Sequence, residues 1–240
     1  MNSEPEDPKA FQEQTDTICH TYRQATERYY RGLHTVCVDE KTGIQALERA
    51  RPTRPLRAGT PERQEFEYIR HGTQTLIANF EVATGQVIAP SVGLTRTEED
   101  LAAHLNRTLD LDPDAEWIFV LDQLNTHKSE ALVRLVAKRC KIDADLGVKG
   151  RSGILRSLAT RAAFLTDPSH RIRFIHTPKH CSWLNQVEIW FSILARRLIR
   201  RGNFRSAEHL RQRMLAFIDY HNMAWAQPLK WTYQGKVLAA

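Results

Sequence analysis

Three acidic residues, Asp39, Asp122 and Glu188, are spaced along the chain as a phosphodiester-cutting site with two metal ions would need them. The short apolar runs TVCVD and WIFVLD end at the two aspartates and are typical of buried strands in an open sheet, where function gathers at strand ends. Two ions bridged by carboxylates position a nucleophile and relieve charge at phosphorus, and hard oxygen ligands select Mg²⁺, with Mn²⁺ as a substitute. The pattern indicates a nuclease or a strand-transfer enzyme.

The third acid, Glu188, lies in a segment with helical periodicity. Apolar residues at positions 183, 187, 190, 191, 194 and 198 share one face. Glu188 is about 100° from the centre of that face, so it is expected at the rim between core and solvent. Each acid alone is weak support, because an aspartate at a strand end is most often a turn or capping residue and a glutamate at a helix rim is usually only solvated.

Polar and basic residues flank two of the three acids. His127 and Lys128 follow Asp122 on the loop that leaves the strand, where they could contact a scissile phosphate or the attacking group. The plain alternative for His127 is a histidine of a surface loop. The segment TPKHCSWLNQVE brings three further polar residues toward the same end of the sheet, namely Lys179, His180 and Asn185.

The net charge of +6 is concentrated near the third acid. Between Arg171 and Arg213 there are ten Lys or Arg residues and two acids. Clustered cations favour a polyanion, and DNA is the expected partner. The candidate DNA contacts are Lys41, Lys128, Lys179, His180, Arg196, Arg197, Arg200 and Arg201. At four-residue spacing the arginines form two pairs, 197 with 201 and 196 with 200, and one pair is expected to face DNA. A structural role at a helix C-terminus is the alternative.

The elements that must position these residues alternate between strands and helices. We expect a polar helix over 7–31, a connector rather than core, a strand ending at residue 39, an exposed loop over 41–64 and a hairpin over 72–92. A helix after Thr97, a strand to residue 122, a helix after Ser129, a weakly helical stretch at 141–167 and a strand at 171–178 follow. A helix then carries the third acid, and another covers 207–221. The order predicts an α/β fold with a mixed sheet.

Composition excludes several other classes of protein. No apolar run reaches the length of a membrane span, and the polar, acidic start does not read as a signal peptide, so a cytoplasmic protein is expected. The four cysteines are far apart, which supports neither a zinc site nor a disulfide framework.

Taken together, LDQLNTHKS, HTPKHCSWLNQVEIWF and DEKTGIQALER resemble the catalytic domain of DDE transposases of the insertion sequence 630 and mariner superfamily. The resemblance covers roughly residues 36–222. It implies an RNase H-like fold and a magnesium-dependent reaction, in which water nicks the transposon end and the freed 3′ hydroxyl attacks target DNA. The metal-binding acids of the family fall on Asp39, Asp122 and Glu188, and its motif asparagine falls on Asn185. We therefore expect a helical connector at 1–32, a catalytic domain at 33–222 with an insertion at about 141–167, and a tail at 223–240.

The chain departs from the family pattern at three points. Gln123 stands where the family usually has asparagine, which affects how the acid before it is positioned. The second and third acids are unusually far apart, and no stretch before the first acid is long enough for helix-turn-helix domains, as in a truncated or frame-split product. A remnant that binds DNA without cutting it is therefore an alternative, and an RNase H-like nuclease acting on RNA hybrids or junctions is a third. A homodimer or a DNA-assembled synapse, associated with the nucleoid, is expected.

Overall fold

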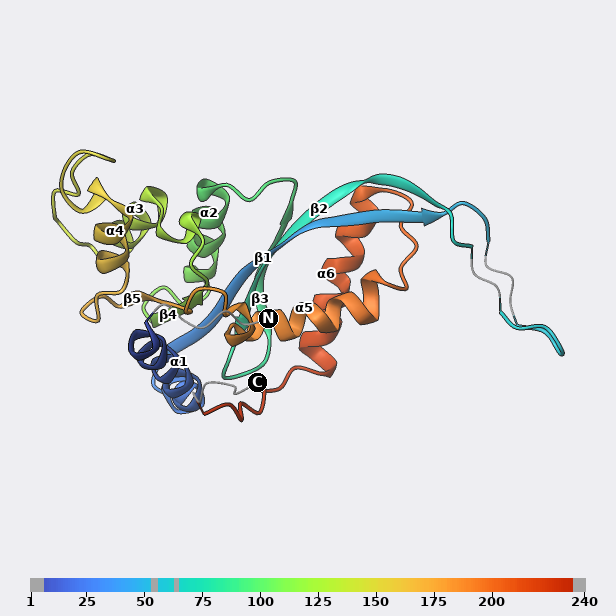
Figure 1. Cartoon of the computed structure of the whole chain (residues 1–240), viewed down its shortest axis with the longest axis horizontal. Coiled ribbons are helices and arrows are strands. Elements are labelled where there is room, and N and C mark those ends of the chain that lie inside the picture. The colour runs from blue at the N-terminus through green and yellow to red at the C-terminus, as the bar shows by residue number, and fades with distance from the viewer. Residues whose placement is uncertain (1–6, 53–55, 63–64, 235–240) are drawn as a thin grey trace.

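A five-stranded mixed sheet organises the chain (Figure 1). The computed structural model describes residues 7–52, 56–62 and 65–234. The strands are β1 (Leu33–Arg49), β2 (Tyr68–Glu81), β3 (Val87–Gly93), β4 (Glu116–Leu121) and β5 (Ile172–His176). Their order is β3-β2-β1-β4-β5. The first three pair antiparallel, whereas β4 runs parallel to both β1 and β5. The predicted α/β fold with a mixed sheet is confirmed.

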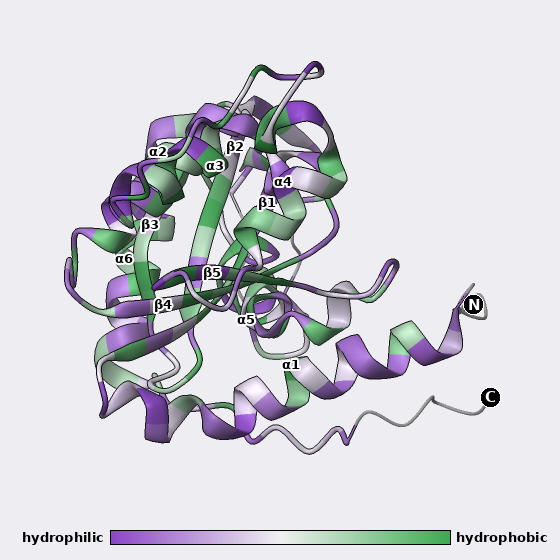
Figure 2. Cartoon of the chain, turned by 90° about the vertical axis from the view of Figure 1, so that its left-hand side faces the viewer, coloured by the Kyte–Doolittle hydropathy of each residue, from purple (hydrophilic) through white to green (hydrophobic). Residues whose placement is uncertain are grey.

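Helices cover both faces of the sheet. One face packs against α1 (Pro8–Tyr29), α5 (Gln186–Leu194) and α6 (Ala207–Ala224). The other packs against α2 (Glu98–Leu109), α3 (Glu130–Arg139) and α4 (Leu158–Leu165). In Figure 2 the apolar colouring follows the central strands, while much of α1 is hydrophilic on its outer side. The chain therefore forms three layers with two apolar cores, one on each side of the sheet.

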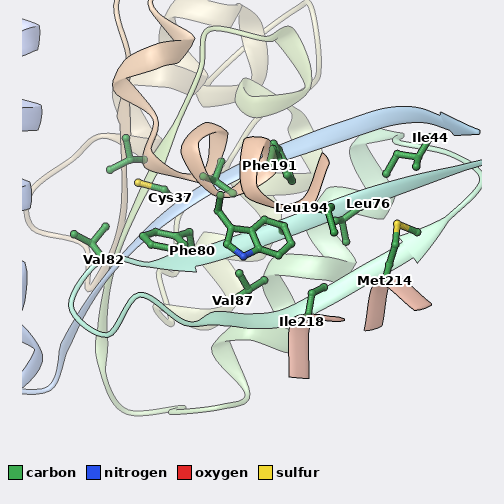
Figure 3. Close-up of a cluster of buried hydrophobic side chains, with 14 of the residues drawn as sticks. Cys37, Ile44, Leu76, Phe80, Val82, Val87, Phe191, Leu194, Met214 and Ile218 are labelled. Atoms are coloured by element: carbon green, nitrogen blue, oxygen red, sulfur yellow. The ribbon is translucent and has the colours of Figure 1, made fainter. Parts of the chain in front are cut away.

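Alternation along the strands divides the apolar side chains between these cores. Val36 and Val38 belong to the core under α2 and α3, whereas Cys37 belongs to the core under α5. Figure 3 shows the core that contains Cys37, to which Phe80 of β2 and Phe191 of α5 both contribute. The side of β1 that carries Cys37 is thus the side that faces α5.

The predicted end of the first strand is wrong. β1 does not stop at residue 39, and the expected exposed loop over 41–64 is a strand as far as Arg49, paired with β2 in a long ribbon (Figure 1). The backbone of this charged run finds its hydrogen bonds in β2, which propensity alone does not reveal. A bulge at Gly43, whose φ is 64°, resets the alternation so that Ile44 and Ala46 are buried. Residues 53–55 and 63–64 of the expected loop lie outside the described part.

The first helix is a core element, contrary to the expectation that it is only a connector. Ile18, Tyr22 and Ala25 of α1 lie in the core that α5 also covers. The Tyr22 hydroxyl donates to the carbonyl of Leu184 at 2.8 Å. Packing across the sheet overrides the polar average of this helix. The tail packs back as predicted, because the ring of Trp231 lies edge-on to Tyr22 at 5.0 Å between centroids.

Most other element predictions are confirmed. Thr97 and Ser129 cap α2 and α3 through their side chains, and the hairpin and last helix lie close to their expected positions. The 141–167 segment contains α4, whose Arg161 donates to the carbonyl of Lys128 at 2.7 Å. Among the described residues no helix is long and apolar enough to cross a membrane. The domain boundaries at residues 32 and 222 stay predictions.

Replacing Tyr22 with phenylalanine tests whether α1 is part of the core. Tyr22→Phe removes the hydroxyl that satisfies the buried Leu184 carbonyl, and we expect the free energy of unfolding to fall by about 1–2 kcal/mol in urea titrations. Tyr30→Phe is the matched control, because Tyr30 is 83% exposed. Equal stabilities for the two variants would contradict the assignment of α1 to the core.

Candidate active site

The sheet places Asp39 and Asp122 on neighbouring parallel strands. Cys37 of β1 is the register partner of Val120 of β4, so the two aspartates, each two residues further on, lie beside one another. Cys37 and Val120 both belong to the core under α5. Because side chains two residues apart point to the same face, both aspartates project toward α5. β4 ends at Leu121, which leaves Asp122 at the strand tip and Asp39 in the middle of the longer β1.

Glu188 reaches the same place from the first turn of α5. Asn185 caps this helix, and its amide donates to the Val38 carbonyl at 2.9 Å. Asn185 is fully buried, so the bond fixes the start of α5 to the strand position next to Asp39. Glu188 is half-buried, as predicted for the rim of its helix. The structure thus brings the three predicted acids to one face of the sheet.

Asp39 is in a strongly unfavourable environment for a negative charge. It is 8% exposed. Burial, together with the charges of Asp122, Glu40 and Glu188, raises the pKa of Asp39 to about 7, although a hydrogen bond from the backbone N–H of Glu40 lowers it. Asp39 therefore lies within electrostatic reach of both Asp122 and Glu188.

A buried histidine compensates part of this negative charge. Nδ1 of His127 lies 2.7 Å from Asp122 Oδ1, and its Nε2 lies 3.2 Å from Glu40 Oε1. Burial would lower the pKa of His127, but hydrogen bonds to the two carboxylates raise it to about 10. Burial would likewise raise the pKa of Asp122, but the bond to His127 outweighs it and the pKa is lowered. The alternative of a surface-loop histidine is excluded, because His127 is 0% exposed.

Polar contacts from β5 fix the end of β4. The Gln123 amide donates to the Thr177 carbonyl at 2.8 Å and accepts a hydrogen bond from Lys128. Nδ1 of His176 lies 3.2 Å from the Asp122 carbonyl oxygen, which accepts its hydrogen. The longer side chain of Gln123, compared with asparagine, therefore bridges two strands rather than remaining loose.

Sequence reasoning missed Glu40 and His176. Glu40 follows Asp39 in a strand and must face the opposite layer, where an acid needs a cationic partner. That rule could have paired Glu40 with His127. His176 ends β5 beside the tip of β4, and only the strand order reveals this.

The donor chemistry of the site fits a hard divalent cation. Asp39, Asp122 and Glu188 supply carboxylate oxygens, which Mg²⁺ and Mn²⁺ prefer. The raised pKa of Asp39 reports negative charge that a cation would relieve. In the described part of the chain, no three His, Cys, Asp or Glu side chains already stand as a ligand set. The three acids as metal ligands therefore stay a prediction.

The predicted DNA contacts near the site differ in how exposed they are and in whether other side chains already engage them. Lys179 and His180 are exposed, and His180 has a φ of 61°, which is uncommon outside glycine. The ammonium of Lys41 lies over the ring of Phe191, 5.6 Å from its centroid. Lys128 is half-buried and engaged with Gln123.

The predicted pairing of the arginines is met for one pair and not for the other. α5 continues as a π-helical turn over Ala195–Ile199, closed by a bond from Arg200 N to Ala195 O at 2.9 Å. This turn holds one residue more than an α-helical turn. Arg197 and Arg201 line one cavity together, but Arg196 lines it too and Arg200 is not among its lining residues. Which of the arginines face DNA stays a prediction. All four arginines are exposed.

Asp39→Asn should stabilise the protein above pH 7. The pKa of Asp39 in the folded state, about 7, exceeds its ordinary value of 3.8, so the folded state binds more protons between these values. The free energy of unfolding therefore falls as pH rises through this window. In metal-free buffer we expect Asp39→Asn to be more stable than wild type by about 3 kcal/mol at pH 8 and equally stable near pH 3.5. The exposed Asp114→Asn is the control, and a pH-independent difference would refute the expectation.

His127→Gln should destabilise the protein in the opposite pH range. The folded-state pKa of about 10 lies above the ordinary 6.5, so the stabilisation is complete below pH 6.5 and is lost as pH rises through 10. At pH 6 we expect a loss of about 3 kcal/mol, because Glu40 is left buried without its cation. The loss should shrink toward pH 10 in chemical denaturation. His180→Gln, at an exposed position, should change little, and an undiminished loss at pH 10 would rule out the charged His127.

The chain is similar to several solved structures of a transposase. No curated protein matches the chain. A Mos1 transposase paired-end complex with left transposon end is 16% identical over 86% of this chain and 55% of that chain, with a TM-score of 0.49. The Mos1 transposase catalytic domain with Raltegravir and Mn is 13% identical over 86% of this chain and 82% of that chain, with a TM-score of 0.47. The chain spans about half the length of the transposase in the paired-end complex.

A family model described as DDE superfamily endonuclease matches residues 34–211, which is well over half of the chain and includes all three acids. The chain belongs to the DDE superfamily of endonucleases.

Proposed function

We propose that this chain is the catalytic domain of a DDE transposase, which nicks and transfers DNA strands during transposition of an insertion sequence. One observation carries the proposal. Asp39 and Asp122 lie beside one another on parallel strands, and the charge of Glu188, held at the start of α5, acts on Asp39. In a DDE endonuclease, such convergence supports a role for these acids in cutting phosphodiester bonds.

The three acids would hold two Mg²⁺ ions, or Mn²⁺ in their place. When bound, such ions supply an activated water and relieve charge at phosphorus. The other side chains act on the acids themselves. Asn185 ties α5 to β1, and His127 holds Asp122 through a bond of 2.7 Å while keeping a proton on each ring nitrogen. Gln123 and His176 keep the tip of β4 in place, so that Asp122 does not move with the loop after it.

DNA is the proposed partner, as transposon end and as target. Lys179 and the arginines after α5 are exposed and carry positive charge toward solvent, and the exposed His180 lies next to Lys179. Guanidinium groups suit bidentate contacts with phosphate, which position a duplex without reading its sequence. Joining two DNA ends requires two active sites, so we propose a homodimer or a DNA-assembled synapse acting at the nucleoid.

A second function, DNA binding without cleavage, is favoured by one observation. The carboxylate of Asp122 is ion-paired with the buried His127 at 2.7 Å. Metal binding must then shift Asp122 away from His127 or leave it bound to both. A remnant that fails in this step would bind DNA with strong dependence on salt and would not cut it.

Plasmid nicking separates these functions. With Mg²⁺ or Mn²⁺ we expect supercoiled DNA to be nicked, and Asp122→Asn to lower the rate by more than about 100-fold, since even the groups that support metal ligands are worth 10–100-fold. Asp114→Asn, an exposed aspartate before β4, is the matched control and should nick at the wild-type rate. Activity unchanged by Asp122→Asn would refute the site. Salt-sensitive binding with no nicking by wild type would favour the remnant, and faster cutting of an RNA–DNA hybrid would favour an RNase H-like nuclease.

A further inference from the structure

A second site lies along α5, beyond the acids. A cavity of about 870 Å³ is enclosed by the π-helical turn, α6, the β2–β3 turn and the chain that follows α6. The chain after α6 closes one wall tightly, because a Cβ on Gly85 would stand 1.9 Å from the carbonyl oxygen of Gln227. The volume falls within the range of small-molecule sites. It is a built cavity in a part of the chain that the acids do not use.

The charged side chains that line this cavity are all positive. Four arginines line it, Arg196, Arg197, Arg201 and Arg213, and no acidic residue is among the lining residues. In the described ranges no ion pair joins any of the four to an acid, and Glu208, on the preceding turns of α6, is paired with Arg211 at 3.3 Å. Four uncompensated guanidinium groups around one cavity favour an anionic ligand, and their planar shape suits phosphate.

Aromatic rings form the rest of the wall. Trp225 is 39% exposed, and the guanidinium of Arg197 lies over its ring at 4.3 Å from the centroid. Tyr220 meets the same ring edge-on at 4.8 Å between centroids. A flat ring flanked by cations is the arrangement on which unpaired bases stack in proteins that bind single strands.

Two buried nitrogens in the wall lack hydrogen-bond partners within the described residues. They are Nε1 of Trp190, which is fully buried, and Nδ1 of His221, which is 5% exposed. Nε2 of His221 donates to the Gly85 carbonyl at 3.1 Å, so in the neutral ring Nδ1 is an acceptor. Both residues line the cavity, and one of the two unpaired atoms is a donor and the other an acceptor. Buried groups of this kind are costly unless something satisfies them, and a nucleobase edge carries both complements.

We infer that this cavity binds an unpaired nucleotide of the DNA strand, with its phosphate on the arginines and its base against Trp225. The inference rests on the proposed function, because it takes DNA as the ligand. Arg197 lies nine positions after Glu188, which corresponds to about 14 Å along a helix. About four stacked nucleotides span the same length. The cavity would then hold the strand about four nucleotides from the acids.

The test measures preference for an unpaired extension. A blunt DNA duplex is compared with the same duplex carrying a five-nucleotide extension at either the 3′ end or the 5′ end. Both extensions carry 2-aminopurine at their fourth unpaired position. Binding is measured in EDTA, so that cleavage plays no part. For wild type we expect one extension to bind about tenfold more tightly than the blunt duplex, and stacking to quench the 2-aminopurine fluorescence.

Variants assign this preference to the cavity. Trp225→Ala and, at an exposed position that tolerates change, Arg213→Gln should each remove most of the tenfold preference while blunt-duplex binding changes less than about twofold. Arg151→Gln removes an exposed arginine from the 141–167 segment and should behave as wild type. Circular dichroism confirms that each variant is folded, and Arg213→Gln keeps the test decisive if Trp225→Ala does not fold.

Three results would overturn the inference. They are no preference for either extension, a preference that both variants retain, and displacement of the extension by an acidic peptide more readily than by an oligonucleotide of equal charge. Plasmid nicking by the same wild-type preparation keeps the two proposals apart. Nicking without the preference would reject the nucleotide site alone, whereas the preference without nicking would reject strand cleavage and leave the site standing.

Discussion

The negative charge gathered around the buried Asp39 is the constraint on which the site depends. Asp122 and Glu188 come from other parts of the chain, and Glu40 adds a further negative group on the other side of β1. No attraction between these acids holds them in place. The sheet ladder, the Asn185 bond to β1 and the cores on both faces must supply the free energy that does.

The charge is relieved unevenly, and this unevenness has chemical meaning. Asp122 is satisfied by a buried imidazolium, whereas Asp39 receives one backbone N–H and is left with the largest penalty. When the unfavourable charge sits mainly on one carboxylate, a bound cation relieves the cost of burying that charge. The carboxyl group then releases its proton as the cation binds. His127 also links the two faces of the sheet, since its second partner, Glu40, lies on the side of α2 and α3.

Much of this arrangement follows from the sequence. The apolar run before Asp122, the caps at Thr97 and Ser129 and the apolar face of α5 are local patterns, and each survives in the fold. The predictions that were wrong concern elements whose structure depends on a partner from elsewhere in the chain. β1 passes Asp39 because β2 offers a hydrogen-bonding edge, and α1 is buried because Tyr22 reaches a carbonyl 162 residues away in sequence. The burial of His127 depended on Glu40, whose direction is clear only once the strand is known to continue.

The π-helical turn at Ala195–Ile199 makes the direction of the last arginines depend on backbone hydrogen bonding rather than on residue type. The turn takes up one extra residue, because its hydrogen bond spans five residues where an α-helix spans four. Removing one residue from it would therefore restore an ordinary helix and leave Arg200 and Arg201 close to their present orientations. Straightening the turn without removing a residue would instead rotate both arginines by about 100°, with the net charge unchanged. An alignment with relatives that lack the extra residue should therefore place its gap inside this turn, where it leaves the later arginines matched to side chains that point the same way.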